Sequence, residues 1–187
     1  MSPSPFAAFL IGKSVQLRPL EKSDLPLLVS WNNDPEIRSL TGEVYPSTVH
    51  STEAWFDHNK DDPSRVWFII EVRGTGNPIG ECGLLRIFPP WRTTDLTMII
   101  AEKSCQGKGF GTEAITLLME YAFGTLAMHR ISIGVVGFNH KALAFYEKMG
   151  FQREGIQRDG YFFNHEFSDF ILLSILEDEF RAKNPRA

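Results

Sequence analysis

Apolar and polar residues alternate in several short runs, which is the period of a half-buried β-strand. A first strand near residues 14–18 is predicted by "SVQLRPL". A hairpin over residues 66–88 is predicted by "RVWFIIEVR", the turn "GTGN" and "PIGECGLLRIF". Further strands are predicted by "TTDLTMIIA" and by "HRISIGVV", near residues 130–136. The run "FQREGIQRDGYFFNHEFSDFILLSIL" predicts two long strands that turn near Asn164 and His165.

Four segments between these strands carry helix signals, namely a capping residue and apolar residues at helical spacing. The third of them follows the glycine-rich stretch "CQGKGFG" near residue 110. The first is expected to be capped by Ser23 or Asp24 and broken at Asn33, Asp34 and Pro35. The second is expected to be capped by Ser51, and the fourth to be capped by Asn139 and stopped by Gly150. This order of elements predicts an α/β (α+β) fold with a largely antiparallel sheet, in one domain over residues 1–187. We expect residues 1–12 to be an N-terminal extension and residues 180–187 a flexible tail.

Composition narrows the class of protein without naming an activity. The chain has 187 residues, is 43% apolar and carries a formal charge of −4, which indicates a globular protein and disfavours nucleic acid as a partner. No run approaches the ~18 apolar residues of a membrane span, and the start "MSPSPFAAFLIGK" lacks the basic residues of a signal peptide. Cys82 and Cys105 have neither disulfide-motif nor zinc spacing, so we expect reduced thiols in the cytoplasm. The five histidines show no metal-ligand spacing, and no metal is expected.

The glycine-rich stretch "CQGKGFGTEAI" carries the first chemical signal. It contains no Walker loop, and its glycines have the wrong spacing for a dinucleotide fingerprint. It does fit Q-x-x-G-x-G at Gln106, Gly109 and Gly111, between a strand and a helix. In that setting backbone N–H groups and the helix N-terminus can bind a pyrophosphate. A tight strand-to-helix turn explains the same glycines.

A second motif, "NHKALAFYEKMGF", begins beyond one helix and one strand after this loop. Together the two motifs resemble the GNAT family of acetyl-CoA-dependent N-acetyltransferases. The stretches "LRPLEKSDL", "QGKGFGTEA" and "YFFNHEFSDFILLSI" look most like the branch that holds spermidine N-acetyltransferases and ribosomal-protein N-terminal acetyltransferases. The resemblance implies a GNAT-like fold with a mixed, mostly antiparallel sheet of about seven strands and about four flanking helices. It also implies acetyl-CoA as co-substrate.

The resemblance places cofactor contacts on matching positions. It implies that loop amides hold the pyrophosphate of CoA, that the strand end pairs with the pantetheine arm as an added strand would, and that Tyr146 lies near the sulfur. The implied cofactor-binding residues are Met98, Ile99, Ile100, Gln106, Gly107, Lys108, Gly109, Phe110, Gly111, Thr112, Asn139 and Tyr146. The chain departs from the branch at Cys105 and Gln106, where many members have an aromatic pair.

Acetyl transfer to an amine needs a neutral nucleophile and a proton for the leaving thiolate. An alkylammonium has a pKa of about 10.4, so neutralising it at pH 7 costs about 4–5 kcal/mol and a base is useful. We expect Asp95 as the first candidate base, with Glu81 next, and Tyr146 as the proton donor. A solvated strand position for the carboxylates and an ordinary core position for the tyrosine are the alternatives. Cys105 as a covalent nucleophile is a further one, without a partnering histidine nearby.

The acceptor is expected to be a primary amine, either a polyamine such as spermidine or a protein N-terminus. Acidic residues between the first strand and "RVWF" would attract a cation; they are Asp34, Glu36, Glu43, Glu53, Asp57, Asp61 and Asp62. Trp31, Trp55 and Trp91 are candidate walls of the acceptor pocket, although large aromatics are often core residues. The alternatives are acetylation of an amino sugar or antibiotic and a non-catalytic sensor of acyl-CoA. A homo-oligomer is left open.

Overall fold

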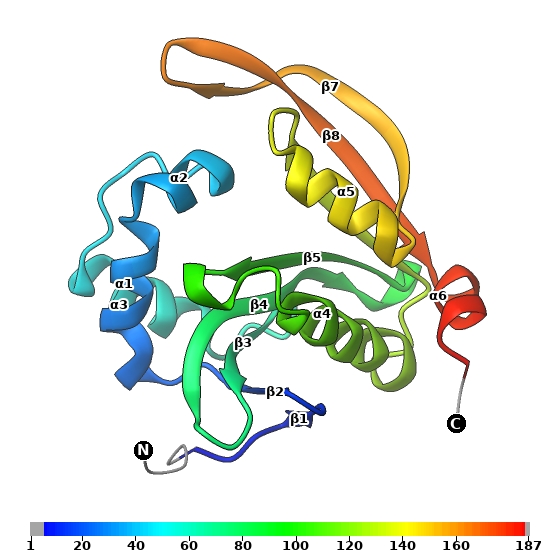
Figure 1. Cartoon of the computed structure of the whole chain (residues 1–187), viewed down its shortest axis with the longest axis horizontal. Helices are drawn as coiled ribbons and strands as arrows, with labels where there is room; N and C mark the ends of the chain where they lie inside the picture. The colour runs from blue at the N-terminus through cyan, green and yellow to red at the C-terminus, as the bar shows by residue number, and fades with distance from the viewer. Residues whose placement is uncertain (1–5, 186–187) are drawn as a thin grey trace.

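The computed structural model describes residues 6–185 and places one twisted sheet at the centre of the fold (Figure 1). The eight strands lie in the order β1-β2-β3-β4-β5-β6-β8-β7. They are β1 (Leu10–Ile11), β2 (Val15–Pro19), β3 (Val66–Val72), β4 (Asn77–Phe88), β5 (Thr93–Ile100), β6 (Arg130–Val136), β7 (Gln152–Phe163) and β8 (Glu166–Leu176). Within residues 6–185 only β5 and β6 pair in parallel, so the sheet is mixed and mostly antiparallel, as the sequence predicts.

The helices lie on both faces of this sheet. The α-helices among the described residues are α1 (Leu25–Asn32), α2 (Pro35–Thr41), α3 (Val49–Asn59), α4 (Phe110–Glu120), α5 (His140–Met149) and α6 (Glu177–Lys183). Shorter helical turns are η1 (Lys22–Asp24), η2 (Pro89–Trp91), η3 (Lys103–Cys105) and the π-helical turn η4 (Tyr121–Thr125). No helix in the described part of the chain is long and apolar enough to cross a membrane.

Two hydrophobic clusters lie on opposite faces of the sheet. The larger one packs α4, α5 and α6 against one face, with Ile115, Leu118 and Phe180 among its fully buried side chains. The smaller one packs Leu28 and Trp31 of α1 and Ile37 of α2 against Ile69 of β3 on the opposite face. The helices before the hairpin therefore cover the face opposite α4, as Figure 1 shows at its left.

Three elements differ from the sequence prediction. Residues 10 and 11, expected within an N-terminal extension, add the edge strand β1 through pairing with Leu17 and Gln16. The break at Asn33, Asp34 and Pro35 ends α1 but also starts α2, because the Asp34 side chain accepts hydrogen bonds from the N–H groups of Glu36 and Ile37.

The expected tail from residue 180 is also different, since α6 continues to Lys183 with Phe180 buried. For α3 the cap is Thr48 rather than Ser51; the two side chains form a reciprocal capping box. The cap Asn139 and the stop Gly150 of α5 are confirmed.

A buried ionic cluster fixes the start of the α1 segment on the sheet. The guanidinium of Arg18 on β2 donates to both oxygens of Asp24, at 2.7 and 2.8 Å, and to Glu71 on β3 at 2.6 Å. All three side chains are buried. Since a buried charge is tolerated only when it is paired, this cluster ties η1 to strands β2 and β3 and so places α1.

Candidate active site

A cleft opens where β5 and β6 separate. The two strands pair over three residues, from Thr93 with Arg130 to Asp95 with Ser132, and beyond that point both line a cleft of about 680 Å³. On its other side β5 stays paired with β4 as far as Ile100. The backbone edge of β5 that faces the cleft is therefore available to a ligand that pairs as an added strand.

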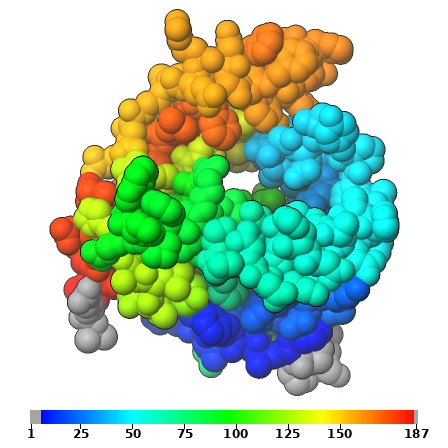
Figure 2. Space-filling view, turned by 180° about the vertical axis from the view of Figure 1, so that it is seen from behind, coloured from blue at the N-terminus to red at the C-terminus, as the bar shows by residue number. Residues whose placement is uncertain are grey.

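Figure 2 shows this region from behind, where the surface is hollowed between the light-blue and cyan residues of α2 and α3, the green strands and the orange β7–β8 arm. Helix α2 is tied to both sides of the cleft. Glu36 pairs with Lys103 in the loop after β5 at 2.6 Å, and the Tyr161 hydroxyl of β7 donates to the Ser39 carbonyl at 2.9 Å. These two contacts make α2 one wall of the cleft.

The glycine-rich loop forms the end of the cleft where α4 begins. Gly107 and Gly109 have φ of 72° and 87°, in the left-handed region, and a Cβ built on either would meet open space. Gly109 is the N-cap of α4 and has no side chain to cap the helix. Its carbonyl accepts the first hydrogen bond of the helix, from the N–H of Glu113. The amides of residues 110–112 are thus the orphan donors of an eleven-residue helix, a suitable site for a pyrophosphate.

Two other residues of this loop line the cleft and lie against the end of β5. The Gln106 side chain donates to the Ile100 carbonyl at 2.9 Å, so it ties the loop to the end of β5. A Cβ at Gly111 would lie 3.5 Å from Ile100 and 3.6 Å from Met98, in ordinary contact with two side chains that line the cleft. A side chain at Gly109 would therefore project into open space, whereas one at Gly111 would contact the lining of the cleft.

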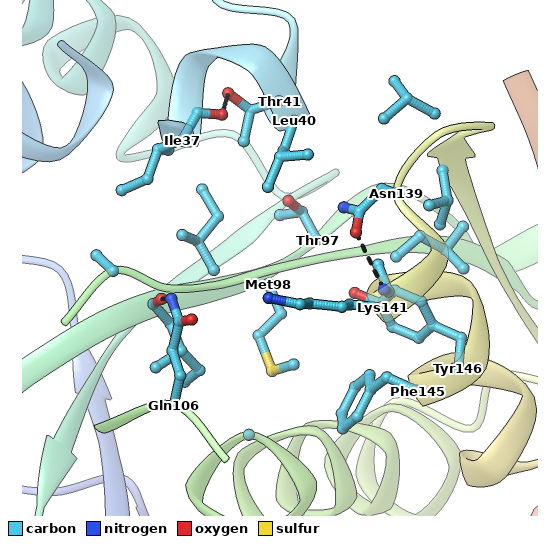
Figure 3. A pocket seen from close by; sticks show the side chains of 18 of the residues that line it. Ile37, Leu40, Thr41, Thr97, Met98, Gln106, Asn139, Lys141, Phe145 and Tyr146 are labelled. Atoms are coloured by element: carbon cyan, nitrogen blue, oxygen red, sulfur yellow. Dashed lines mark hydrogen bonds between the residues drawn. The ribbon is translucent and has the colours of Figure 1, made fainter. Parts of the chain in front are cut away.

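Helix α5 supplies the opposite wall. The Asn139 side chain accepts the N–H of Ala142 at 3.1 Å, which orients the first turn. Figure 3 shows Lys141, Phe145 and Tyr146 reaching into the cavity from α5, with Met98 of β5 below and Ile37, Leu40 and Thr41 of α2 on the far side. The helix thus presents a cation and an aromatic pair to whatever lies along β5.

Tyr146 combines burial with access to the cleft. Its side chain is 5% exposed, and its ring packs edge-on against Phe145 and Phe151 at centroid distances of 5.2 and 5.4 Å. Burial raises the pKa of Tyr146, and the nearby Cys82 thiol raises it further. The phenol therefore keeps its proton through neutral and mildly alkaline pH, as a proton donor must.

A second cavity of about 370 Å³ adjoins the cleft on the α1–α3 face of the sheet. The two share the lining residues Thr41, Thr97 and Ile99. The smaller cavity is also lined by Glu43 and Tyr45 of the loop before α3 and by aromatic and acidic groups, which are Trp55, Trp67 and Glu81. It has the composition of a pocket for an organic cation.

Glu81 is the buried carboxylate of this second cavity. It is 6% exposed, and its Oε2 accepts the indole N–H of Trp67 at 2.7 Å. Burial raises the pKa of Glu81, the hydrogen bond from Trp67 lowers it, and the charge of Glu43 raises it. A carboxylate with a raised pKa beside an open cavity is suited to accept and pass on a proton.

The structure does not bring Asp95 to this position. Asp95 and Ile99 lie on the same face of β5, and Ile99 is the residue of β5 that is paired with Glu81 on β4. Asp95 lies four residues nearer the start of β5, about 13 Å along the strand. It forms an ion pair with Arg86 and lines neither cavity. The position of Asp95 therefore does not support the preference for it as base, whereas Glu81 lines the second cavity and stays a candidate.

Some of the remaining candidate residues line one of the two cavities and others do not. The cofactor residues implied by resemblance line the cleft except Lys108, which is exposed, and Phe110, which packs on the core. Of the seven acidic residues expected to attract the acceptor, Glu36 lines the larger cleft and Glu43 lines the second cavity, and the other five line neither. Among the tryptophans Trp55 does, while Trp31 is buried core and Trp91 is exposed. Sequence reasoning missed Trp67 and Thr97, because no motif marks them and the pairing of strands brings them to the site. It also missed Lys141, which stands inside the second motif and lines the cleft from α5.

The splayed strands, the glycine loop and the two connected cavities define a CoA-dependent acyltransferase with a mixed α/β fold. The model of the acetyltransferase (GNAT) domain matches residues 14–152, so the chain belongs to the GNAT acetyltransferase family. It is an N-acetyltransferase that uses acetyl-CoA as co-substrate.

One curated relative and two solved structures of a second one illustrate the similarity. Spermidine N(1)-acetyltransferase of Escherichia coli (strain K12) is 30% identical over 172 residues, covering 91% of this chain and 90% of that protein. The crystal structure of spermidine N-acetyltransferase from Vibrio cholerae in complex with CoA and spermine is 30% identical, with a TM-score of 0.85 over 90% of this chain and 99% of that one. A dodecameric structure of the Vibrio cholerae enzyme in an intermediate state is 28% identical, with a TM-score of 0.80 over 92% of this chain and 99% of that one.

The geometry predicts a selective loss of cofactor binding in Gly109→Ala. The added methyl group enters the space beside the orphan amides, so affinity for acetyl-CoA should fall by about tenfold or more. Gly74→Ala is a matched control, because Gly74 has nearly the same φ, 85°, and equally open space, but lies in the β3–β4 turn.

Both variants carry the same left-handed strain and should lose similar thermal stability. Isothermal calorimetry on the folded variants separates strain from binding. Equal affinities in the two variants would show that the loop is a turn and not an anion site.

Proposed function

We propose that the chain transfers the acetyl group of acetyl-CoA to a primary amine of a polyamine such as spermidine. The observation that carries this proposal is the buried carboxylate Glu81 in an aromatic cavity that joins the cofactor cleft at Thr97 and Ile99. The relatives whose names include spermidine or spermine support the same class of acceptor.

The second cavity is suited to an amine with more than one positive charge. Glu43 and Glu81 contribute two carboxyl groups to its lining. The rings of Trp55 and Trp67 pack edge to face, with 5.3 Å between their centroids. Carboxylates attract ammonium groups, and aromatic faces bind the alkyl segments and the cations. A chain with amines at intervals uses both carboxylates at once, which a peptide N-terminus with one charge does not.

The proposed chemistry divides between the two cavities. Acetyl-CoA supplies the activated acyl group. Glu81, directly or through a water molecule, accepts the proton of the ammonium so that the neutral amine can attack. The Tyr146 hydroxyl donates its proton to the thiolate that leaves, and solvent restores it. The C–N bond forms as the C–S bond of the thioester breaks, and the second proton lost by the amine nitrogen passes to solvent as the amide forms.

Two further expectations remain proposals. The free cysteines Cys82 and Cys105 support a reducing compartment such as the cytoplasm. The dodecameric relative supports self-association of this chain, which sedimentation velocity can decide.

A thiol-release assay across an amine panel tests the acceptor class. We expect kcat/KM to be highest for spermidine or spermine, lower for basic peptides and lowest for aminoglycosides, because the two carboxylates suit spaced charges. Turnover of aminoglycosides alone would replace the acceptor while leaving the enzyme class intact. Binding of acetyl-CoA with transfer to no amine would favour a sensor.

The role of Glu81 is tested by Glu81→Gln. At pH 7 we expect kcat/KM for spermidine to fall by about 10²–10⁴-fold, with a smaller loss at pH 9, where more of the amine is already neutral. Asp95→Asn is the matched control, because it removes a strand carboxylate of the same sheet face outside both cavities, and it should change kcat/KM little. The opposite ranking would return the role to Asp95.

The role of Tyr146 is tested by Tyr146→Phe. The ring and its packing remain, so acetyl-CoA affinity should change little, whereas kcat should fall by about 10²–10⁴-fold with the proton donor removed. Calorimetry and kcat are measured on the same preparation. Normal binding together with normal turnover would remove Tyr146 from the mechanism.

A further inference from the structure

We propose that Trp67 is a positioning residue for Glu81, whose indole N–H fixes the carboxylate at the junction of the acceptor cavity and the cofactor cleft. The proposal rests on the proposed function, in which Glu81 accepts the amine proton. It assigns to β3 a part in the reaction that the sequence motifs, which lie after β4, do not indicate.

Strand register brings the two side chains together. Trp67 is paired with Gly83 and Ile69 with Glu81, so Trp67 and Glu81 are diagonal neighbours on one face of the β3–β4 ladder. The Trp67 Nε1 lies 2.7 Å from the Glu81 Oε2, a short N–H···O hydrogen bond to a carboxyl oxygen. The indole therefore reaches across the position of Gly83 to the carboxylate.

Gly83 leaves the space that this reach requires. A Cβ at position 83 would lie 3.0 Å from Cε3 and 3.2 Å from Cδ2 of Trp67, and 2.6 Å from the Val66 carbonyl oxygen. Any side chain there would push the indole away from the strand. The glycine thus makes room for the ring, and Trp55 packs edge to face against the same ring, at a centroid distance of 5.3 Å and an interplanar angle of 78°.

The contact selects one oxygen of the carboxylate. Trp67 occupies Oε2, which leaves Oε1 as the oxygen that accepts the proton of the amine. The indole N–H is a donor that cannot itself accept a proton. It holds the carboxylate without competing for the proton that is transferred.

The groups around Glu81 set its pKa, and the hydrogen bond from Trp67 opposes two of their effects. Burial disfavours the charged form of Glu81, and so does Glu43 from the loop before α3. Tyr45 of the same loop is the other titratable group lining this cavity, while Cys82 next along β4 lies on the opposite face, beneath Tyr146. Against these influences the Trp67 hydrogen bond lowers the pKa of Glu81, because it stabilises the carboxylate.

The experiment compares Trp67→Phe with Trp55→Phe, the matched control that removes an indole from the same cavity. Without its donor the charged form of Glu81 is less stable, so the acid-side midpoint of the kcat/KM profile should rise by about one pH unit in Trp67→Phe. Trp55→Phe changes the aromatic wall and can raise KM, but its midpoint should stay at the wild-type pH. A folded Trp67→Phe enzyme with an unshifted midpoint would overturn the proposal.

A second measurement needs neither turnover nor a folded variant at position 67. In the wild-type protein the indole ¹H–¹⁵N resonance of Trp67 should titrate together with the side-chain ¹³C resonance of Glu81. Glu81→Gln should abolish that titration. An indole resonance that is insensitive to pH over the range in which Glu81 titrates would contradict the contact.

The two results also separate this proposal from the proposed function. If the resonances titrate together but Glu81→Gln retains full activity, the contact stands and Glu81 is not the base. If Glu81→Gln is inactive while Trp67→Phe leaves the midpoint unchanged, Glu81 is the base and Trp67 does not position it.

Discussion

The active site depends on the separation of β5 from β6 after three residue pairs. Each strand is held on its outer side, β5 by β4 and β6 by β8, so the two halves of the sheet diverge as rigid units. The divergence exposes a length of backbone edge on β5 and opens the larger cleft between them. The glycine loop at the end of β5 and α5 after β6 then face each other across it. A fully paired β5–β6 ladder would leave no edge for the pantetheine arm and no path to Tyr146.

The acceptor side depends on a balance around one buried carboxylate. Burial makes Glu81 a better proton acceptor than a solvated carboxylate, but too large a rise in its pKa would leave it protonated and unable to act at neutral pH. The hydrogen bond from Trp67 opposes that rise. The cluster of Arg18 with Asp24 and Glu71 secures the helical segment that encloses this cavity. Glu71 of the ionic cluster and Trp67, the hydrogen-bond donor to Glu81, therefore lie on the same face of β3.

Local signals predicted much of the fold. The bounds of α5 follow from Asn139 and Gly150, because a capping side chain and a left-handed glycine act on adjacent residues. Elements that depend on distant partners were missed: β1 needs β2 beside it, and α6 is held by burial of Phe180 against the core. The segment before Pro35 was read as a break, although the same Asp34 that ends one helix starts another.

The candidate site was predictable to the same degree. Gly109, Asn139 and Tyr146 stand in contiguous motifs, and all three line the larger cleft. The choice between Asp95 and Glu81 could not be made from alternation, since both side chains lie on one sheet face and only the placement of α1–α3 decides which is enclosed. Trp67 has no sequence signal at all, because its partner is fourteen residues away and is reached diagonally across a glycine.

The account is tested most directly by amide hydrogen exchange with and without CoA. If CoA lies along the free edge of β5 with its pyrophosphate on the glycine loop, protection should increase at the amides of residues 97–100 and 107–112. The amides of residues 66–72 on β3, which are paired with β2 and β4, should change little and serve as an internal reference. Unchanged exchange at both segments of the cleft in the presence of saturating CoA would contradict the account.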